Sequence, residues 1–131
     1  MRRGYVAAAL AALALALAAC SDGPQPGALV VQLAGVPGAR AVKFRLVGPQ
    51  TGVTAPAGSP VLVASAQLSG DTVMIAAFAP VGDTLNGAVL ARLSVSDVRA
   101  SARYTATVLE VAGPTYALQN PAQYTLTVVR P

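Results

Sequence analysis

Short alternating segments fill the chain from position 28 onward, and turn residues separate them. Apolar residues recur at every second position, and no stretch keeps the 3.6-residue period of an amphipathic helix. Clusters of Gly, Pro, Asn and Asp stand between the segments, which is typical of antiparallel strands. The pattern predicts an all-β fold, an antiparallel jelly-roll-like sandwich of about seven to nine strands. The strands that can be placed are Leu29–Leu33, Ala41–Val47, Val61–Leu68, Thr72–Ala79, Ala88–Val95, Tyr104–Val111 and Tyr124–Val129.

The clearest alternation lies in Ala41–Val47. Successive side chains of an extended strand point to opposite faces, so one face of this segment is apolar and the other carries two basic residues. The two sets are Val42, Phe44 and Leu46 against Lys43, Arg45 and Val47. We therefore expect a half-buried strand whose basic side faces water.

Other segments define their buried face less sharply. In Tyr104–Val111, apolar residues occur on both faces, so both faces could be partly buried. In Tyr124–Val129, all even positions are apolar, whereas two of the odd positions hold threonine. Val73–Phe78 is apolar on both faces, which indicates a central strand or a strand beneath a covering loop.

Turn residues predict how the strands connect. Gly70–Asp71 lies between two strand-like runs, which predicts a tight hairpin with Gly at a positive φ angle. Asn86–Gly87 is a second turn signal, directly before a strand. Gly48–Pro60 has three prolines and three glycines, so we expect it to cross between sheets or to form an exposed loop. Pro114–Pro121 is a further irregular connection.

The N-terminal part of the chain follows a different pattern. Arg2 and Arg3 precede an apolar run from Tyr5 to Ala19. The run is about 15 residues long, as in a signal peptide, whereas a membrane-spanning helix needs about 20. It ends at Cys20, the only cysteine of the chain. The sequence Leu17-Ala18-Ala19-Cys20 resembles the lipobox of bacterial lipoproteins.

The lipobox resemblance implies that the Cys20 thiol receives a diacylglycerol, that a signal peptidase cuts before it, and that the new amine is acylated. Several acyl chains would hold the protein stably, because one chain binds a membrane only marginally. The protein would then be anchored in the cell envelope, on the extracytoplasmic side of the outer or the cytoplasmic membrane. Two alternatives stay open. A secretory signal cleaved at Ala16–Ala18 leaves Cys20 as a free thiol, and an uncleaved anchor needs a longer apolar core.

The charge balance changes once the leader is set aside. Nine basic residues less Arg2 and Arg3 leave seven, against five acidic residues, so the remaining net charge is +2. With no basic cluster and few aromatic residues, we expect no nucleic-acid partner. One cysteine cannot form a disulfide within the chain, so a fold of about 110 residues must rest on its hydrophobic core.

Candidate catalytic groups are scarce. The chain has no histidine and no second cysteine, which excludes Ser-His and Cys-His catalysis and the common zinc sites. Asp71, Asp83 and Asp97 each stand beside Gly, Thr or Ser, where an aspartate side chain bonds nearby backbone amides. Calcium binding is the functional alternative for them, although the repeated acidic spacing of a calcium loop is absent. We expect no enzymatic activity, no metal and no cofactor.

Two sets of side chains are candidates for binding. Three tyrosines could form a surface on which a sugar stacks, or they could pack in and around the core. They are Tyr104, Tyr116 and Tyr124. Lys43 and Arg45, with Arg40 nearby, form either an ordinary solvated face or a contact for an anionic partner. With the loop Gly48–Pro60, Lys43 and Arg45 make up the candidate binding surface.

The segment from Leu29 to Leu46, L-V-V-Q-L-A-G-V-P-G-A-R-A-V-K-F-R-L, is similar to the first two strands of cohesin-type domains. There an alternating strand, a short Pro-Gly turn and an apolar-x-Phe-x-Leu strand recur. Gly70–Phe78 and Leu85–Leu93 resemble a later strand pair, and the whole resemblance covers Leu29–Val111. Gly48-Pro49-Gln50 replaces the usual Tyr-Asp-Pro-like continuation, so we transfer no dockerin-binding residue.

These observations predict three regions and two classes of function. The regions are a signal peptide at 1–19, a lipidated cysteine with a flexible tether at 20–27 and a cohesin-like β-sandwich at 28–131. The first function is a noncatalytic, membrane-anchored module that binds or scaffolds an envelope protein or a carbohydrate. The second is a structural envelope lipoprotein or an accessory subunit of a larger envelope complex. The fold alone does not choose between them, because sandwiches carry unrelated functions.

Overall fold

The computed structural model describes residues 23–131, and these residues form an all-β sandwich. Cys20 and the rest of the predicted signal segment lie outside the described residues. The predicted all-β antiparallel sandwich is confirmed, with nine strands between residues 23 and 131. The elements are β1 (Gly27–Gly35), β2 (Ala41–Val47), β3 (Gly52–Thr54), β4 (Leu62–Ser69), β5 (Thr72–Phe78), β6 (Val89–Val95), the 3₁₀ helix η1 (Ser101–Arg103), β7 (Thr105–Ala112), β8 (Leu118–Gln119), the 3₁₀ helix η2 (Pro121–Gln123) and β9 (Tyr124–Val129).

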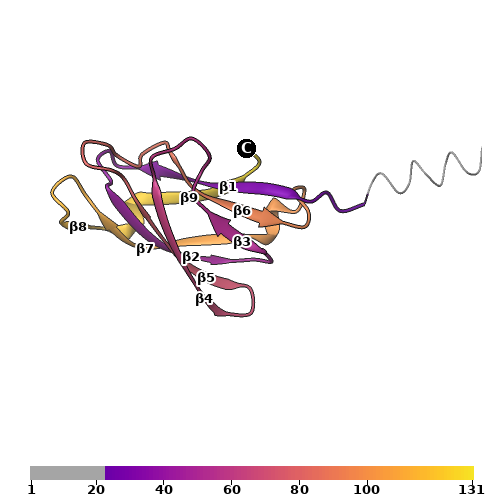
Figure 1. Cartoon of the computed structure of the whole chain (residues 1–131). Coiled ribbons are helices and arrows are strands. Elements are labelled where there is room, and N and C mark those ends of the chain that lie inside the picture. Colours follow the sequence, from indigo (N-terminus) through magenta and orange to yellow (C-terminus); the bar gives the residue numbers. More distant parts are fainter. Residues whose placement is uncertain (1–22) are drawn as a thin grey trace, which may run out of the picture.

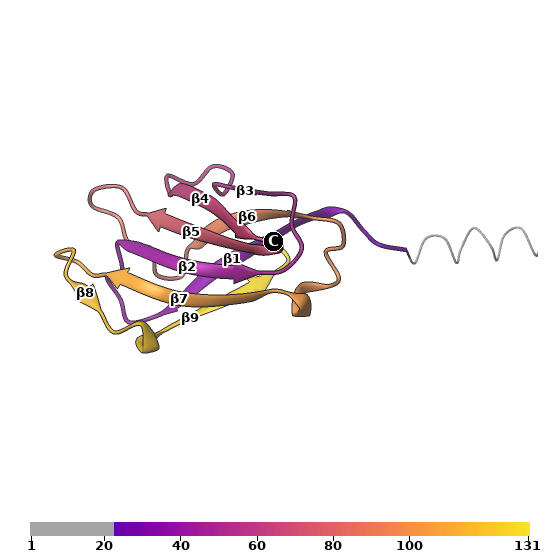
Figure 2. The ribbon, with the colours of Figure 1, turned by 90° about the horizontal axis from the view of Figure 1, so that it is seen from below.

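The strands form two antiparallel sheets that pack face to face (Figure 1). The four-stranded sheet has the order β3-β6-β1-β9, and the five-stranded sheet has the order β4-β5-β2-β7-β8. Figure 2, a view from below, shows β7, β2, β5 and β4 side by side in that order. The side of each sheet that faces away from the other sheet is called its outer face below.

The alternation in β2 has the predicted phase. Phe44 is fully buried and stands opposite Ile75 on β5 and Val108 on β7, whereas Lys43 and Arg45 are exposed. Opposite residues on neighbouring strands share a face, so this register gathers the inward apolar residues of three strands in one layer. The largest fully buried side chains are those of Leu29, Leu33, Phe44, Leu46, Ile75, Leu85, Leu90 and Leu93.

A β-bulge explains the ambiguous alternation of β7. Leu109 is an extra residue, because the pairing with β2 passes from Val108 directly to Glu110. The inserted residue shifts the alternation, so Val108 before it and Val111 after it both pack in the core. A segment that is apolar on both faces can therefore be a regular strand with one bulge.

The long connection Gly48–Pro60 crosses between the sheets, which is one of the two outcomes expected for it. It leaves β2 in the five-stranded sheet, pairs as β3 with β6 in the four-stranded sheet, and returns to β4. The alternation does not predict β3 or β8, because strands of three and two residues have no detectable period.

β4 and β5 form the predicted tight hairpin. Ser69 stands opposite Thr72, so Gly70 and Asp71 make a two-residue loop. Gly70 has a φ of +50°, which fits the first central position of a type II′ turn. The hairpin extends beyond the rest of the sandwich (Figure 1).

Hydrogen bonds join loops at both ends of the sandwich. At one end, Asn86 accepts a bond from the Ala39 N–H at 2.9 Å and donates one to the Val36 carbonyl at 2.6 Å, which joins the β1–β2 and β5–β6 loops. At the other end, the Tyr104 hydroxyl donates to the Pro49 carbonyl. Each end therefore has a side chain that holds two connections together.

The segment before β1 is bound to the connection between β6 and β7. The Gln25 N–H donates to the Asp97 carboxylate at 3.3 Å, and the Val98 N–H donates to the Gln25 carbonyl at 2.8 Å. Arg99 donates to the Gly23 carbonyl at 2.5 Å. Residues 23–25 therefore lie on the fold before the chain enters β1.

Candidate binding face

The outer faces of the two sheets differ in polarity. The outer face of the four-stranded sheet has a polar residue on every strand, next to apolar residues such as Val30 and Val89, as is common for an antiparallel sheet in contact with water. Its polar residues are Gln32, Thr54, Arg92, Ser94, Thr125 and Thr127. The outer face of the five-stranded sheet is apolar over much of its area. Its apolar residues are Ala41, Val47, Leu62, Ala64, Ala66, Met74, Ala76, Phe78, Ala112 and Leu118.

A shallow hollow of about 200 Å³ lies on the outer face of the five-stranded sheet. Ala41, Ala76 and Ala112, on three neighbouring strands, line it together with the larger Phe78 and Leu118. Phe78 is 43% and Leu118 is 73% exposed, so both side chains are open to a partner. The hollow arises because alanine side chains project little beyond the backbone.

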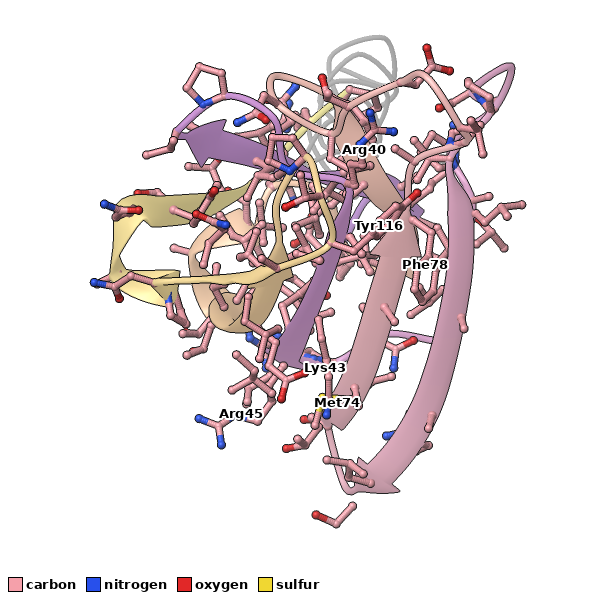
Figure 3. The ribbon with its side chains drawn as sticks, turned by 90° about the vertical axis from the view of Figure 1, so that its left-hand side faces the viewer. Arg40, Lys43, Arg45, Met74, Phe78 and Tyr116 are labelled. Atoms are coloured by element: carbon pink, nitrogen blue, oxygen red, sulfur yellow. The ribbon has the colours of Figure 1, made fainter. Side chains whose placement is uncertain are left out.

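Arg40 and Tyr116 extend this face at the end where β2 begins (Figure 3). The Arg40 guanidinium carbon lies 5.8 Å from the centre of the Tyr116 ring, within the range of a cation–π contact. Tyr116 is 59% exposed and has a φ of +62°, which residues other than glycine seldom adopt. Arg40 is half-buried, so the interpretation as an ordinary solvated side chain does not hold for this residue.

Lys43 and Arg45 lie farther along the same face, near Met74 (Figure 3). Arg45 stands opposite Met74 on β5, and Lys43 stands opposite Glu110 on β7. Their exposure on an outward side is as predicted, and their role in binding stays a prediction. With Arg40, three basic side chains face one acidic side chain here, so the face is basic as well as apolar.

The structure does not bring the loop Gly48–Pro60 to Lys43 and Arg45. Its residues Pro56, Ala57 and Ser59 share a hollow with Val30 and Arg92 of the four-stranded sheet. Lys43 and Arg45 lie on the outer face of the other sheet. The two parts of the candidate surface therefore cannot contact the same small ligand.

The three tyrosines do not form one surface. Tyr104 and Tyr124 are 8% and 6% exposed, so the packing interpretation is correct for them. Burial raises the pKa of the Tyr104 phenol above its ordinary value of 10.0. The Tyr104 ring also lies against Gly48, where a Cβ atom would clash with it.

The three candidate aspartates lie in separate turns, and none borders the hollow. Asp71 is in the β4–β5 turn, Asp83 is in the β5–β6 loop, and Asp97 follows β6. The Arg99 N–H donates to the Asp97 carboxylate at 3.1 Å and lowers the pKa of Asp97 below its ordinary value of 3.8. Within residues 23–131, no group of three or more His, Cys, Asp or Glu side chains could hold a metal ion.

The apolar pattern of β5 on both sides is the sequence signal for this face. β5 lies between β4 and β2, so its interpretation as a central strand is confirmed. Ile75 and Ala77 face the core, whereas Met74 and Phe78 face outward. Tyr116 comes from an irregular segment, where no periodicity marks it.

Comparisons with protein-family models, with curated proteins and with solved structures found no match for this chain. In the part of the chain that the structure describes, no helix is long and apolar enough to cross a membrane. Inferences about function therefore rest on the geometry of the two outer faces.

Proposed function

We propose that this protein is a noncatalytic protein-binding module, anchored by lipid on Cys20 to the extracytoplasmic side of a bacterial membrane, whose partner lies on the outer face of the five-stranded sheet. The observation that carries the proposal is the outward side of β5, where Met74, Ala76 and Phe78 are only partly covered beside Lys43 and Arg45. A contiguous apolar patch with charged side chains around it is typical of an interaction site.

A protein partner suits this face better than a carbohydrate. A sugar needs polar partners for its hydroxyl groups, and the hollow offers only Lys43 and Glu110 among mostly apolar side chains. The exposed ring of Tyr116 already stacks with Arg40. A protein segment with apolar side chains and a negative charge matches both the apolar hollow and the three basic residues.

The proposed anchor holds the domain close to the membrane. Because residues 23–25 are bound to the turn at 97–99, only Cys20, Ser21 and Asp22 separate the lipid from the fold. Three residues can span at most about 10 Å. A partner in the same membrane meets such a domain at a high local concentration, so a modest intrinsic affinity suffices.

Mass spectrometry tests the anchor. In the wild-type protein isolated from membranes, we expect an N-terminus at Cys20 that carries acyl chains. Cys20→Ser removes the thiol that accepts the lipid, so an unprocessed precursor should accumulate. A mature N-terminus at another residue, or an unmodified Cys20, contradicts the anchor and leaves the binding face to be judged on its own.

Capture of envelope proteins tests the binding face. A chain that begins at Ser21 keeps every strand of both sheets, so it can be immobilised and incubated with detergent-solubilised envelope proteins. Lys43→Glu combined with Arg45→Glu should weaken capture at least about tenfold, because the charge of the face is reversed. Arg92→Glu, on the outer face of the other sheet, is the matched control and should leave capture unchanged.

The same experiment separates the other outcomes. Undiminished capture by the Lys43→Glu, Arg45→Glu variant, with an unchanged circular dichroism spectrum, rules out this face. Specific retention of the Ser21 chain on a glycan array, lost in that variant, replaces the protein partner by a carbohydrate. Robust hydrolase activity in the purified chain overturns the noncatalytic assignment.

A further inference from the structure

β4 is an edge strand without the usual protection against pairing. It is the last strand of the five-stranded sheet and, among residues 23–131, it pairs only with β5. Its eight residues include no charged residue and no proline. Its bulge lies between Gln67 and Ser69, near one end of the strand. Natural proteins usually block such an edge with lysine, proline, a central bulge or a covering loop.

The residue pattern of β4 is nearly symmetric about Ser65. The segment Leu62–Leu68 reads L-V-A-S-A-Q-L, so alanine comes first and leucine third on both sides of the serine. Leu62 is 65% and Leu68 is 55% exposed. If two such strands pair antiparallel with Ser65 opposite Ser65, alanine meets alanine across the pair, and Leu62 of each copy lies beside the bulged Leu68 of the other.

We propose that β4 pairs antiparallel with β4 of a second copy of this chain, centred on Ser65, so that two five-stranded sheets join into one of ten strands. Opposite residues of an antiparallel pair have their side chains on the same face. One residue must therefore stand opposite the same residue of the other copy, and the two-fold axis passes between these two residues. An axis at Ala64 would place Pro60, which lacks an N–H, opposite Leu68. An axis at Ala66 would place Gly70 of the turn opposite Leu62. Only the axis at Ser65 pairs Leu62–Leu68 with itself.

The distribution of charge favours a second copy as the occupant of this edge. Because β4 is uncharged, two copies bring no like charges into opposition. Lys43 and Arg45 lie on β2, two strands away. The two β2 strands of the dimer are therefore five strand spacings apart, about 24 Å. This separation exceeds the screening length of about 8 Å at physiological ionic strength.

The two-fold axis is also compatible with anchoring in one membrane. It runs perpendicular to the joined sheets, so the N-terminal segments of the two copies leave at opposite ends but at the same height. Both can then reach one flat membrane surface. The dimer itself depends neither on the anchor nor on the partner proposed for the outer face.

Cysteine cross-linking of the full-length chain tests the pairing. Opposite residues of an antiparallel pair have Cα atoms about 4.5 or 5.5 Å apart, within the range of about 4.4–6.8 Å that a disulfide spans. Ser65→Cys should therefore give a disulfide-linked dimer when membranes and soluble fractions are treated with a mild oxidant. Gln67→Cys is the matched control, because Gln67 of the two copies would be about 14 Å apart. The wild type shows any background from Cys20.

Charge swaps provide a second test, in which every variant has the same cysteine and only the charge of the paired strands changes. With Ser65→Cys present, Ala64→Lys combined with Ala66→Lys sets like charges against each other and should reduce the dimer at least about tenfold. Ala64→Glu combined with Ala66→Glu should do the same. Co-expression of the two variants with tags of different size should restore cross-linking, now between unlike chains.

The outcomes separate this proposal from that for the outer face. Lys43→Glu with Arg45→Glu should leave the Ser65→Cys dimer unchanged, whatever it does to capture of a partner. Equal yields from Ser65→Cys and Gln67→Cys, or no rescue by the Lys and Glu pair, would overturn the two-fold pairing. A disulfide from Ser65→Cys to a different protein only would overturn it as well and identify another occupant of the edge.

Discussion

The outer faces of the two sheets differ in polarity although both belong to the same sandwich. Both sheets bury apolar side chains inward, but the four-stranded sheet presents Thr125 and Thr127 to water where the five-stranded sheet presents Met74 and Phe78. Packing of the core requires only the inward residues. The four-stranded sheet shows that an outer face of this fold can carry polar residues, so the apolar residues on the outer face of the five-stranded sheet are not required for folding. The difference locates the candidate site without any catalytic motif.

The largest expected effect contrasts two phenylalanines on neighbouring strands. Phe44 is fully buried, so Phe44→Ala should lower the free energy of unfolding by about 3–5 kcal/mol. Phe78 is 43% exposed on the outer face, so Phe78→Ala should cost less than about 1 kcal/mol. Urea unfolding of both variants measures the difference. Equal costs would mean that the outer face is part of the core, and the contrast between the faces would fail.

A smaller effect is expected for the loops that border the apolar face. Asn86→Ala leaves the N–H of the buried Ala39, next to Arg40, without its acceptor, and such a loss costs about 1–3 kcal/mol. Asn120 is the matched control, since its side chain bonds the exposed Ala122 N–H at 3.1 Å and water can replace it. Thermal unfolding should give Asn86→Ala a lower midpoint temperature than Asn120→Ala. The reverse order would show that Asn86 does not hold this border.

Conversion of one face into the other should hardly change stability. Met74→Thr combined with Ala76→Thr gives the five-stranded sheet the polar pattern of the four-stranded sheet. Because threonine suits strands, we expect a change within about 0.5 kcal/mol together with loss of partner capture. Urea unfolding and the capture experiment provide the two readouts. A large loss of stability would show that the apolar face supports the fold.

The smallest expected effect is the dependence of stability on pH. The pKa of Asp97 is lower in the folded protein than its ordinary value of 3.8, chiefly because of the hydrogen bond from the Arg99 N–H. Ionised Asp97 therefore stabilises the fold above that value, and the stabilisation is lost as the pH falls through the lower, folded pKa. Urea midpoints of the wild type should fall more between pH 5 and pH 2 than those of Asp97→Asn.

The same titration has an internal control. The chain has no histidine, so the midpoint should stay nearly flat between about pH 5 and pH 8. Asp97 lies in the β6–β7 connection and is not part of either outer face. Identical acid profiles for the wild type and Asp97→Asn would show that its hydrogen bonds do not lower its pKa.

Most of the strands could be predicted because alternation is a local property. The phase of β2 follows from Val42, Phe44 and Leu46 alone, and Gly70 predicts its turn by itself. The bulge at Leu109 could not be predicted, because it depends on the pairing with β2. The partner of each strand depends on residues far apart in the chain, as when Gly27 pairs with Val95.

The candidate site was predictable only in part for the same reason. The outward exposure of Lys43 and Arg45 follows from alternation. The contact of Arg40 with Tyr116 arises where the β7–β8 connection lies beside the start of β2. The two residues are far apart in the sequence, so the alternation of apolar and polar residues does not predict their contact. The loop Gly48–Pro60 is long and exposed, but its crossover carries it to the other side of the sandwich.

The way in which the chain enters the fold determines how the domain bears a mechanical load. β1 follows directly from the N-terminal segment and is paired with β6 along one edge and with β9 along the other. A pull on the N-terminus runs along β1, and the hydrogen bonds, which lie perpendicular to the strand, share the force. They must shear together, whereas the bonds of a hairpin pulled apart at its open end break one after another. A partner that drags on this domain therefore pulls against two hydrogen-bond ladders at once.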